Sequence, residues 1–316
     1  MSSFKIPEKQ ASRDEELTRD QGNSKLWYSF RAGRITASML KAACHSDPRM
    51  PSKSLINTIC YPEAVKLSTK ATEYGLTHET EVLCKYKDNM EQGHSDFIIR
   101  KSGFVIHPEV PYLGASPDSI VSCSCCGHGS SEVKCPFSKT DMMIQDAIIS
   151  DDGFCLEISD NGHPKLKTSH AFYYQVQFQI FCTNTEYCDF VVWTGKDLHW
   201  ERILQDQDFL EVCMQRAHSF LLLAVLPELL ARFYSSPATT AVSAQNGDTM
   251  CYCHSSRDTA TKEVMTCSYK KCPYGIFNKK CLRFTSLNLT EHQQKLKNWY
   301  CPHCVQLGVS KGVNEE

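Results

Sequence analysis

Three charged residues in the middle of the chain have the types and spacing of a hydrolytic site: Asp118, Glu132 and Lys134. One residue separates Glu132 from Lys134, so on a β-strand both side chains project from the same face. Asp118 is expected at the mouth of the preceding strand, where it joins them. Two carboxylates supply the oxygen ligands that Mg²⁺ or Mn²⁺ prefers, and a lysine orients a water or counters the charge on a phosphate. The pattern predicts phosphodiester hydrolysis.

An isolated Glu-x-Lys is more often an ordinary ion pair on an exposed strand. The flanking sequence favours the catalytic interpretation here. Pro117 and Pro136 restrict the backbone on either side of the charged residues, and segments 104–106 and 120–121 have the apolar composition of buried strands. Charged residues at the ends of buried strands usually have a function.

The elements that must position these residues predict an α/β protein with a mixed central sheet flanked by helices. The turn between Asp118 and Glu132 is too short for a parallel crossover, so the strands on either side of it are predicted to be adjacent and antiparallel. Hydrophobic periodicity predicts further elements. They are a helix over 73–86, a hairpin over 154–167, a helix over 170–181, strands at 189–193 and 199–203, and one or two amphipathic helices over 207–234.

The run Ser116-Pro-Asp118, followed by Glu132-x-Lys134-Cys-Pro-Phe137, resembles the core of the lambda-exonuclease or YqaJ-type viral recombinases of the PD-(D/E)xK nuclease superfamily. The resemblance implies the PD-(D/E)xK nuclease fold. It also implies a metal-dependent deoxyribonuclease, and in particular a 5′-to-3′ exonuclease acting on the ends of double-stranded DNA. Asp118 and Glu132 would hold the Mg²⁺ or Mn²⁺ ion.

A second match lies near the N-terminus, where Arg31 is followed seven positions later by Ser38 in an Ile-Thr-Ala-Ser context. Thr36 or Ser38 can cap the helix that follows, and the helix amides with Arg31 and Arg34 would form a phosphate site. A capped surface helix with two solvated arginines is the alternative. The family resemblance implies that Arg31 and Ser38 bind the DNA 5′-phosphate.

Two further positions follow from the resemblance. Gly75, Glu79 and Tyr86 are similar to a family helix, which makes Glu79 the candidate third acidic residue, with Glu81 as its rival. The family also has a helix rich in Tyr and Gln that ends in Gln-x-Gln. In this sequence the helix repeats glutamine at positions 175, 177 and 179, and a buried helix would leave these amides unsatisfied unless some reach a polar site. The match implies that Gln175 lies at the edge of the active site, and it assigns Gln177 there less firmly.

The C-terminal segment has the cysteine spacing of a two-zinc finger. Zinc binding is expected to stabilise this segment, since about fifty residues cannot build a core without metal. The segment resembles a PHD finger, and this implies two zinc sites. One would use Cys251, Cys253 and Cys281, and the other Cys267, Cys272, Cys301 and Cys304. The family's histidine falls on Asn278, so His254 or water is left as the fourth ligand of the first site. The cage aromatic falls on Ile276, which argues against methyl-lysine reading by the usual cage.

A second group of cysteines lies in the turn between Asp118 and Glu132. Cys123, Cys125 and Cys126, together with Cys135, offer thiolates to zinc but lack the spaced pairs of a standard finger. Packed reduced thiols are the alternative. Both interpretations stay open from the sequence.

Composition limits the function classes further. The 316 residues are 41% hydrophobic and 22% charged, as in globular proteins, and the formal net charge is −2. DNA contacts must therefore come from local clusters and metal. The segment 220–230 is interrupted by Pro227 and Glu228, so no apolar run is expected to span a bilayer, and no membrane partner or secretory signal is expected.

The expected organisation has five parts. Residues 1–22 form a flexible arm or a first solvated helix turn, 23–234 the nuclease domain, 235–250 a linker, 251–305 the finger and 306–316 a tail. A nuclease joined to a PHD-like finger indicates a nuclear protein whose finger docks on a histone tail or another chromatin protein. The oligomeric state is left open.

Two other functions compete with the exonuclease. A chromatin-associated binding protein that uses an inactive nuclease fold as a scaffold would have lost catalytic positions, yet Asp118, Glu132 and Lys134 are all present. A restriction-type endonuclease shares the catalytic core but does not explain the 5′-phosphate motif.

Overall fold

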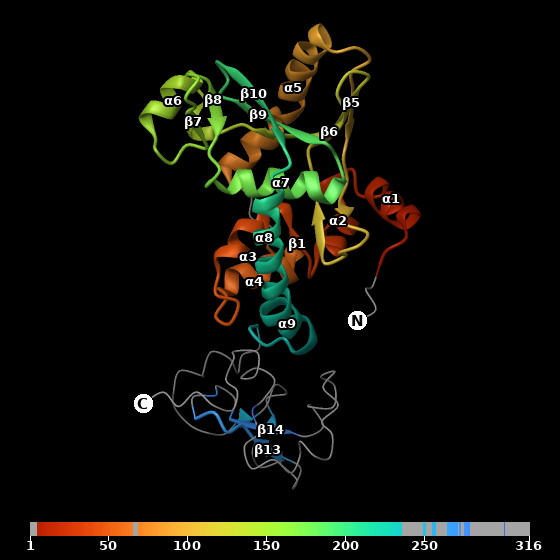
Figure 1. Ribbon diagram of the computed structural model, residues 1–316, viewed down its shortest axis with the longest axis vertical. Coiled ribbons are helices and arrows are strands. Elements are labelled where there is room, and N and C mark those ends of the chain that lie inside the picture. The colour runs from red at the N-terminus through yellow and green to blue at the C-terminus, as the bar shows by residue number, and fades with distance from the viewer. Residues whose placement is uncertain are drawn as a thin grey trace. The chain divides into compact units, whose positions relative to one another are not determined.

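The computed structural model describes residues 5–65, 69–235, 249–250, 255–256, 264–270, 272, 275–278 and 300. The chain divides into two compact units, Met1–Leu229 and Leu230–Glu316 (Figure 1). The domain limits expected from the sequence, at 22, 234, 250 and 305, stay predictions.

A five-stranded mixed sheet forms the centre of the first unit. Its strand order is β10 (Leu198–Leu204), β9 (Tyr187–Trp193), β6 (Gly127–Lys134), β5 (Ser119–Cys123) and β2 (Ile98–Lys101). Strands β6 and β9 are parallel, and the other neighbours are antiparallel. The expected mixed α/β fold is confirmed, and so is the antiparallel pairing of the strands on either side of the cysteine-rich turn.

Two helices cover the faces of this sheet. Helix α5 (Lys70–Gly93) packs on one face with Tyr187 and Val191 of β9, and α7 (Ala171–Thr183) packs on the other with Cys188 and Phe190. Figure 1 shows α7 running across the sheet. All seven residues of β9 are buried, and six of them are apolar or aromatic. The exception, Asp189, pairs with Arg202. The helix expected over 73–86 is thus confirmed and extends further at both ends.

A smaller three-stranded sheet adjoins α7. It consists of β1 (Ile35–Thr36), β4 (Leu113–Ala115) and β3 (Val105–Ile106), with β1 and β4 parallel. Around it lie the short helices α2 (Lys25–Arg31), α3 (Leu40–His45) and α4 (Lys53–Cys60). Gly114 of β4 must be a glycine, because a β-carbon there would lie 2.4 Å from the Phe104 ring. The predicted hairpin is also present as β7 (Leu156–Ile158) and β8 (Pro164–Leu166), preceded by α6 (Ile144–Ser150).

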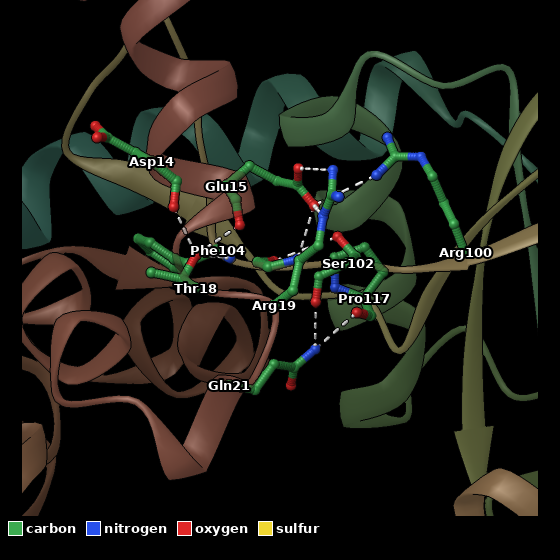
Figure 2. A network of polar contacts seen from close by, with 10 residues as sticks. Asp14, Glu15, Thr18, Arg19, Gln21, Arg100, Ser102, Phe104 and Pro117 are labelled. Atoms are coloured by element: carbon green, nitrogen blue, oxygen red, sulfur yellow. Dashed lines mark hydrogen bonds and ion pairs between the residues drawn. The ribbon is translucent and has the colours of Figure 1, made fainter.

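The N-terminal segment differs from the expected arm. Residues Glu8–Glu16 form helix α1, and Glu15 and Thr18 are buried against the chain near Phe104 (Figure 2). A carboxylate oxygen of Glu15 accepts from the Gly103 backbone N–H at 2.9 Å and from Arg19, and the Thr18 hydroxyl accepts from the Phe104 N–H at 2.8 Å. The polar composition of this segment indicated solvent exposure. Its buried side chains are polar because they accept hydrogen bonds from backbone N–H groups.

The first unit ends in one continuous helix, formed by α8 (Gln207–Phe220), a π-helical turn at Leu221–Val225 and α9 (Leu226–Ala231). It confirms the expected amphipathic helices. By length and composition Gln207–Ala231 suffices to cross a membrane, contrary to the sequence-based expectation. Its face with Cys213, Ala217 and Phe220 is nevertheless buried in the unit, and Glu228 accepts a hydrogen bond from the Tyr61 hydroxyl at 2.7 Å. These contacts are those of a core helix.

The second unit is described only in short segments. Strands β11 (Thr249–Met250) and β12 (Ser255–Ser256) are antiparallel, as are β13 (Val264–Thr266) and β14 (Ile276–Asn278). Cys267 is buried, and its N–H donates to the Gly275 carbonyl. Most of the expected linker and several proposed ligands lie outside the described residues. These ligands are Cys251, Cys253, His254, Cys281, Cys301 and Cys304.

Candidate active site

The carboxylate of Glu132 is the most enclosed acidic group at the predicted site. Glu132 is 3% exposed on β6, facing α7. Its Oε1 accepts from Lys134 Nζ at 2.5 Å and from Gln175 Nε2 at 2.5 Å, and its Oε2 accepts from Gln179 Nε2 at 2.6 Å. The same-face prediction for Glu132 and Lys134 is thus correct, because the two side chains pair directly. Three donors fix the orientation of this carboxylate.

Helix geometry explains which glutamines reach Glu132. Gln175 and Gln179 are four positions apart on α7 and therefore share a face. Gln177 points elsewhere, donating to the Leu204 carbonyl and accepting from the Asp206 N–H. Gln179 is the site residue that sequence reasoning did not select. Its i, i+4 spacing from Gln175 is the signal that could have identified it.

Asp118 lies immediately before β5, beside Glu132. Its N–H donates to the Ser131 carbonyl at 3.1 Å, and its Oδ2 accepts from the Val133 N–H at 2.7 Å, so it contacts both neighbours of Glu132. Burial, followed by repulsion from Glu132 and Glu79, raises the pKa of Asp118 well above its usual range, although Lys134 and the Val133 N–H oppose this. The two carboxylates that the sequence placed together are therefore adjacent.

Glu79 lies on α5 and interacts electrostatically with Glu132 and Lys134. Burial and then the charge of Glu132 raise its pKa, opposed by Lys101 and Lys134. Its rival Glu81 is exposed and pairs with Lys85 and His78, as expected for a solvated residue. Within the described part of the chain, Glu79, Asp118 and Glu132 do not form a group whose carboxylate oxygens all lie within 4.8 Å of one another.

Lys134 is the cation of this acidic cluster. Burial lowers its pKa, but the charges of Glu132 and Asp118 and the hydrogen bond to Glu132 outweigh burial, so the net shift is upward. The ammonium also lies 4.5 Å from the centre of the Phe172 ring. Lys134 is therefore held in its charged form, which suits a role in countering negative charge more than a role as a base.

The residues at this site fit a divalent cation. Burial, followed by repulsion from neighbouring carboxylates, raises the pKa values of Asp118 and Glu79. Carboxylate oxygens are the donors that Mg²⁺ and Mn²⁺ prefer. A cation bound to Asp118 and Glu132 would relieve the repulsion among the three carboxylates.

Arg31, the predicted phosphate ligand, ends α2 next to the loop that leads to Asp118. Its guanidinium stacks 4.0 Å from the centre of the Trp27 ring, and Trp27 Nε1 donates to the Ser116 hydroxyl at 2.8 Å. Burial lowers the pKa of Arg31 to about 10. In the region that the structure describes, the Arg31 side chain has neither an ion pair nor a hydrogen bond. A half-buried guanidinium without an anion is favourably placed to bind one.

Ser38 and Arg34 differ from the phosphate-site expectation. Ser38 is exposed, and its hydroxyl lies 3.3 Å from that of Thr36. Neither hydroxyl caps the following turn or helix through its side chain, so the capping prediction is wrong. Arg34 is engaged with backbone carbonyls, since it donates to Pro111 and Phe30. The turn that carries Ser38 packs on α7, the helix of Gln175.

Comparison with known proteins identifies the family. The model of the YqaJ-like viral recombinase domain matches residues 26–186. The chain belongs to this family. A second model, described as the zinc-finger domain of monoamine-oxidase A repressor R1, matches residues 244–313 of the YqaJ-like protein. The expected zinc finger is therefore found at the C-terminus, whereas its PHD-like type stays a prediction.

Several solved structures are similar to this YqaJ-like protein. An alkaline exonuclease from Laribacter hongkongensis is 21% identical with a TM-score of 0.46, over 63% of this chain and 91% of that one. The shutoff and exonuclease protein of Kaposi's sarcoma-associated herpesvirus is 12% identical with a TM-score of 0.43, over 69% and 73%. A phage-related exonuclease from Haemophilus somnus is 9% identical with a TM-score of 0.38, over 61% and 94%. A search of curated proteins gave no match.

Proposed function

We propose that this protein is a metal-dependent deoxyribonuclease, and specifically a 5′-to-3′ exonuclease acting on the ends of double-stranded DNA. The observation that carries the proposal is the Glu132 carboxylate, fixed by Lys134, Gln175 and Gln179 and adjacent to Asp118. Fixed carboxylates beside an ammonium are suited to phosphodiester hydrolysis. Family membership and the exonuclease names of similar structures agree with this chemistry.

Each residue of the site would have a separate role in hydrolysis. Asp118 and Glu132 would hold Mg²⁺ or Mn²⁺, with Glu79 as the third acidic residue, and the cation would polarise the phosphate and lower the pKa of a bound water. Lys134 would counter the charge that develops on the phosphate. Gln175 and Gln179 would keep the Glu132 carboxylate oriented towards its partners.

Preference for an end with a 5′-phosphate is supported by Arg31. Its guanidinium is stacked on Trp27, and the Trp27–Ser116 hydrogen bond links it to the loop before Asp118. A terminal phosphate bound by Arg31, with Ser38 as a second ligand, would set the distance from the end at which cleavage occurs. The zinc finger would dock the nuclease on a histone tail or another chromatin protein, in the nucleus.

The experiment compares digestion of 5′-phosphorylated linear, 5′-hydroxyl linear and closed circular duplexes, with Mg²⁺ and with EDTA. Wild type should degrade 5′-phosphorylated ends fastest, leave circles intact and lose activity in EDTA. Cleavage of circles would favour the restriction-type endonuclease. Equal DNA binding without any cleavage, unaffected by Lys134→Ala, would favour the inactive scaffold.

Arg31→Ala and Arg34→Ala form a matched pair of variants. Arg31→Ala should slow digestion of 5′-phosphorylated ends much more than that of 5′-hydroxyl ends, because its guanidinium gains little from a neutral hydroxyl. Arg34 donates to carbonyl groups, so its loss should affect both substrates by the same factor. If Arg31→Ala also slows both equally, Arg31 is structural and the end-recognition proposal fails.

A further inference from the structure

Four soft metal ligands converge at the end of the β5–β6 hairpin, away from the predicted active site. They are Nδ1 or Nε2 of His94 and the sulfur atoms of Cys123, Cys125 and Cys126, and all four atoms lie within 4.8 Å of one another. Cys135, the fourth cysteine considered from the sequence, is not among them. We propose that His94, Cys123, Cys125 and Cys126 bind a zinc ion that fastens α5 to the β5–β6 hairpin.

The distances match the edges of a zinc tetrahedron. Zn–S bonds of about 2.3 Å and Zn–N bonds of about 2.0–2.1 Å place two sulfurs about 3.8 Å apart and a nitrogen and a sulfur about 3.5 Å apart. In the structure the Cys125 sulfur lies 3.5 Å from that of Cys123 and 3.8 Å from that of Cys126. His94 Nδ1 lies 3.6, 3.1 and 3.4 Å from the sulfurs of Cys123, Cys125 and Cys126. These separations are too long for a disulfide, in which the sulfurs are about 2.05 Å apart.

The backbone brings these residues together from two segments. Cys123 ends β5 and pairs with Gly127 of β6, which leaves a three-residue turn that contains Cys125 and Cys126. Gly127 has φ +75°, the conformation that closes such a turn, and a β-carbon there would lie 2.4 Å from a Glu186 oxygen. His94 is the residue that follows α5. The ligands are thus supplied by a tight hairpin and by a helix end.

Hydrogen bonds hold the two segments at this distance. The Ser124 N–H donates to the Ser95 carbonyl at 3.1 Å, and the Ser124 hydroxyl donates to Asp96 Oδ2 at 2.8 Å. Three thiolates and a neutral imidazole around Zn²⁺ leave one negative charge, and the guanidinium of Arg202 interacts with the Cys126 side chain. Cys123 is buried and Cys125 is exposed, so the site has an open side through which zinc can enter.

The proposed zinc is structural. Four protein ligands fill a tetrahedral shell and leave no position for a substrate. The hairpin turn is five residues from Glu132, or about 17 Å along β6, and His94 is 15 residues from Glu79, or about 22 Å along α5. The zinc would instead join the far ends of the strand pair and the helix that carry the catalytic carboxylates.

Zinc content of the full-length protein tests the proposal. His94→Ala and the double variant Cys125→Ser/Cys126→Ser should each contain about one zinc ion fewer per chain than wild type, because a closed site binds one ion. Cys84→Ser is the matched control, since Cys84 is an exposed cysteine of α5 outside the cluster, and it should retain the wild-type content. The zinc of the C-terminal finger is common to all the variants and cancels in the comparison. Equal zinc content in all the proteins would overturn the proposal.

Site-resolved alkylation tests the wild-type chain, so it does not depend on whether the variants fold. Zinc-loaded protein is treated with iodoacetamide before and after chelation, and the cysteine-containing peptides are quantified by mass spectrometry. Cys125 should be protected until zinc is removed, whereas Cys84 should react at the same rate in both samples. Equal alkylation of Cys125 with and without chelator, or a disulfide within the cluster, would refute the site.

Discussion

Gln179→Ala tests whether the orientation of Glu132 matters for catalysis. The substitution removes the only donor to Glu132 Oε2 found among the described residues, a hydrogen bond of 2.6 Å in a buried setting. A hydrogen bond to a charged group contributes about 1.5–3 kcal/mol. If that free energy serves to hold Glu132 for the transition state, the rate should fall about 10- to 150-fold, since each 1.36 kcal/mol is tenfold.

The assay is initial-rate digestion of a 5′-phosphorylated linear duplex over a series of Mg²⁺ concentrations. A misoriented Glu132 should also raise the Mg²⁺ concentration needed for half-maximal rate. Gln177→Ala is the matched control, because Gln177 is equally buried on α7 and makes two hydrogen bonds remote from Glu132. Both variants should lose stability, but only Gln179→Ala should show the Mg²⁺ shift. Equal loss of activity in the two variants would refute the positioning role.

Two further predictions concern pH and stability. Asp118→Asn keeps a side-chain oxygen that can accept from the Val133 N–H. It removes the carboxyl group, whose pKa is raised by burial and by the charges of Glu132 and Glu79. The stability contribution of Asp118 is complete below its ordinary pKa and is lost as pH rises through the raised pKa. The variant should therefore be inactive yet melt higher than wild type at neutral pH in EDTA, by about 2–4 °C for each kcal/mol of repulsion relieved; an unchanged or lower Tm would contradict this. For Glu15, burial raises the pKa, but hydrogen bonds from Arg19 and the Gly103 N–H outweigh it, and the net shift is downward. Its contribution is present above the ordinary pKa and is lost as pH falls through the lowered one, so Glu15→Gln should reduce the free energy of unfolding by about 1–3 kcal/mol at neutral pH and by less in acid. Urea denaturation at both pH values measures the difference, and a deficit that does not depend on pH would refute the assignment.

The sequence was sufficient for the mixed type of the sheet, for its antiparallel β5–β6 pair and for the pairing of Glu132 with Lys134. Alternation on a strand placed Glu132 and Lys134 on one face, and the short turn required an antiparallel β5–β6 pair. Both inferences depend only on local geometry, which a sequence specifies directly. The expected strand at 189–193 was likewise identified while its neighbouring strands were unknown, and the strand observed there spans Tyr187–Trp193.

Residues whose partners lie far away in the sequence could not be predicted in this way. Glu15 looked solvated because its partner is the Gly103 N–H, 88 positions along the chain. His94 showed no metal spacing because it is 29 residues from Cys123 and belongs to another element. In both cases the contact is made by tertiary packing, to which periodicity and motif spacing are insensitive.

The carboxylates of the candidate site are held in two different ways, and this difference bears on where a cation would act. Glu132 has a donor on each oxygen, so its charge is largely compensated by Lys134, Gln175 and Gln179. Asp118 receives one backbone N–H, and its pKa is raised by burial and by the charges of Glu132 and Glu79. A divalent cation would therefore relieve the most repulsion beside Asp118. We expect Asp118 to dominate the affinity for Mg²⁺, and the donors around Glu132 to govern how well the bound ion is aligned for hydrolysis.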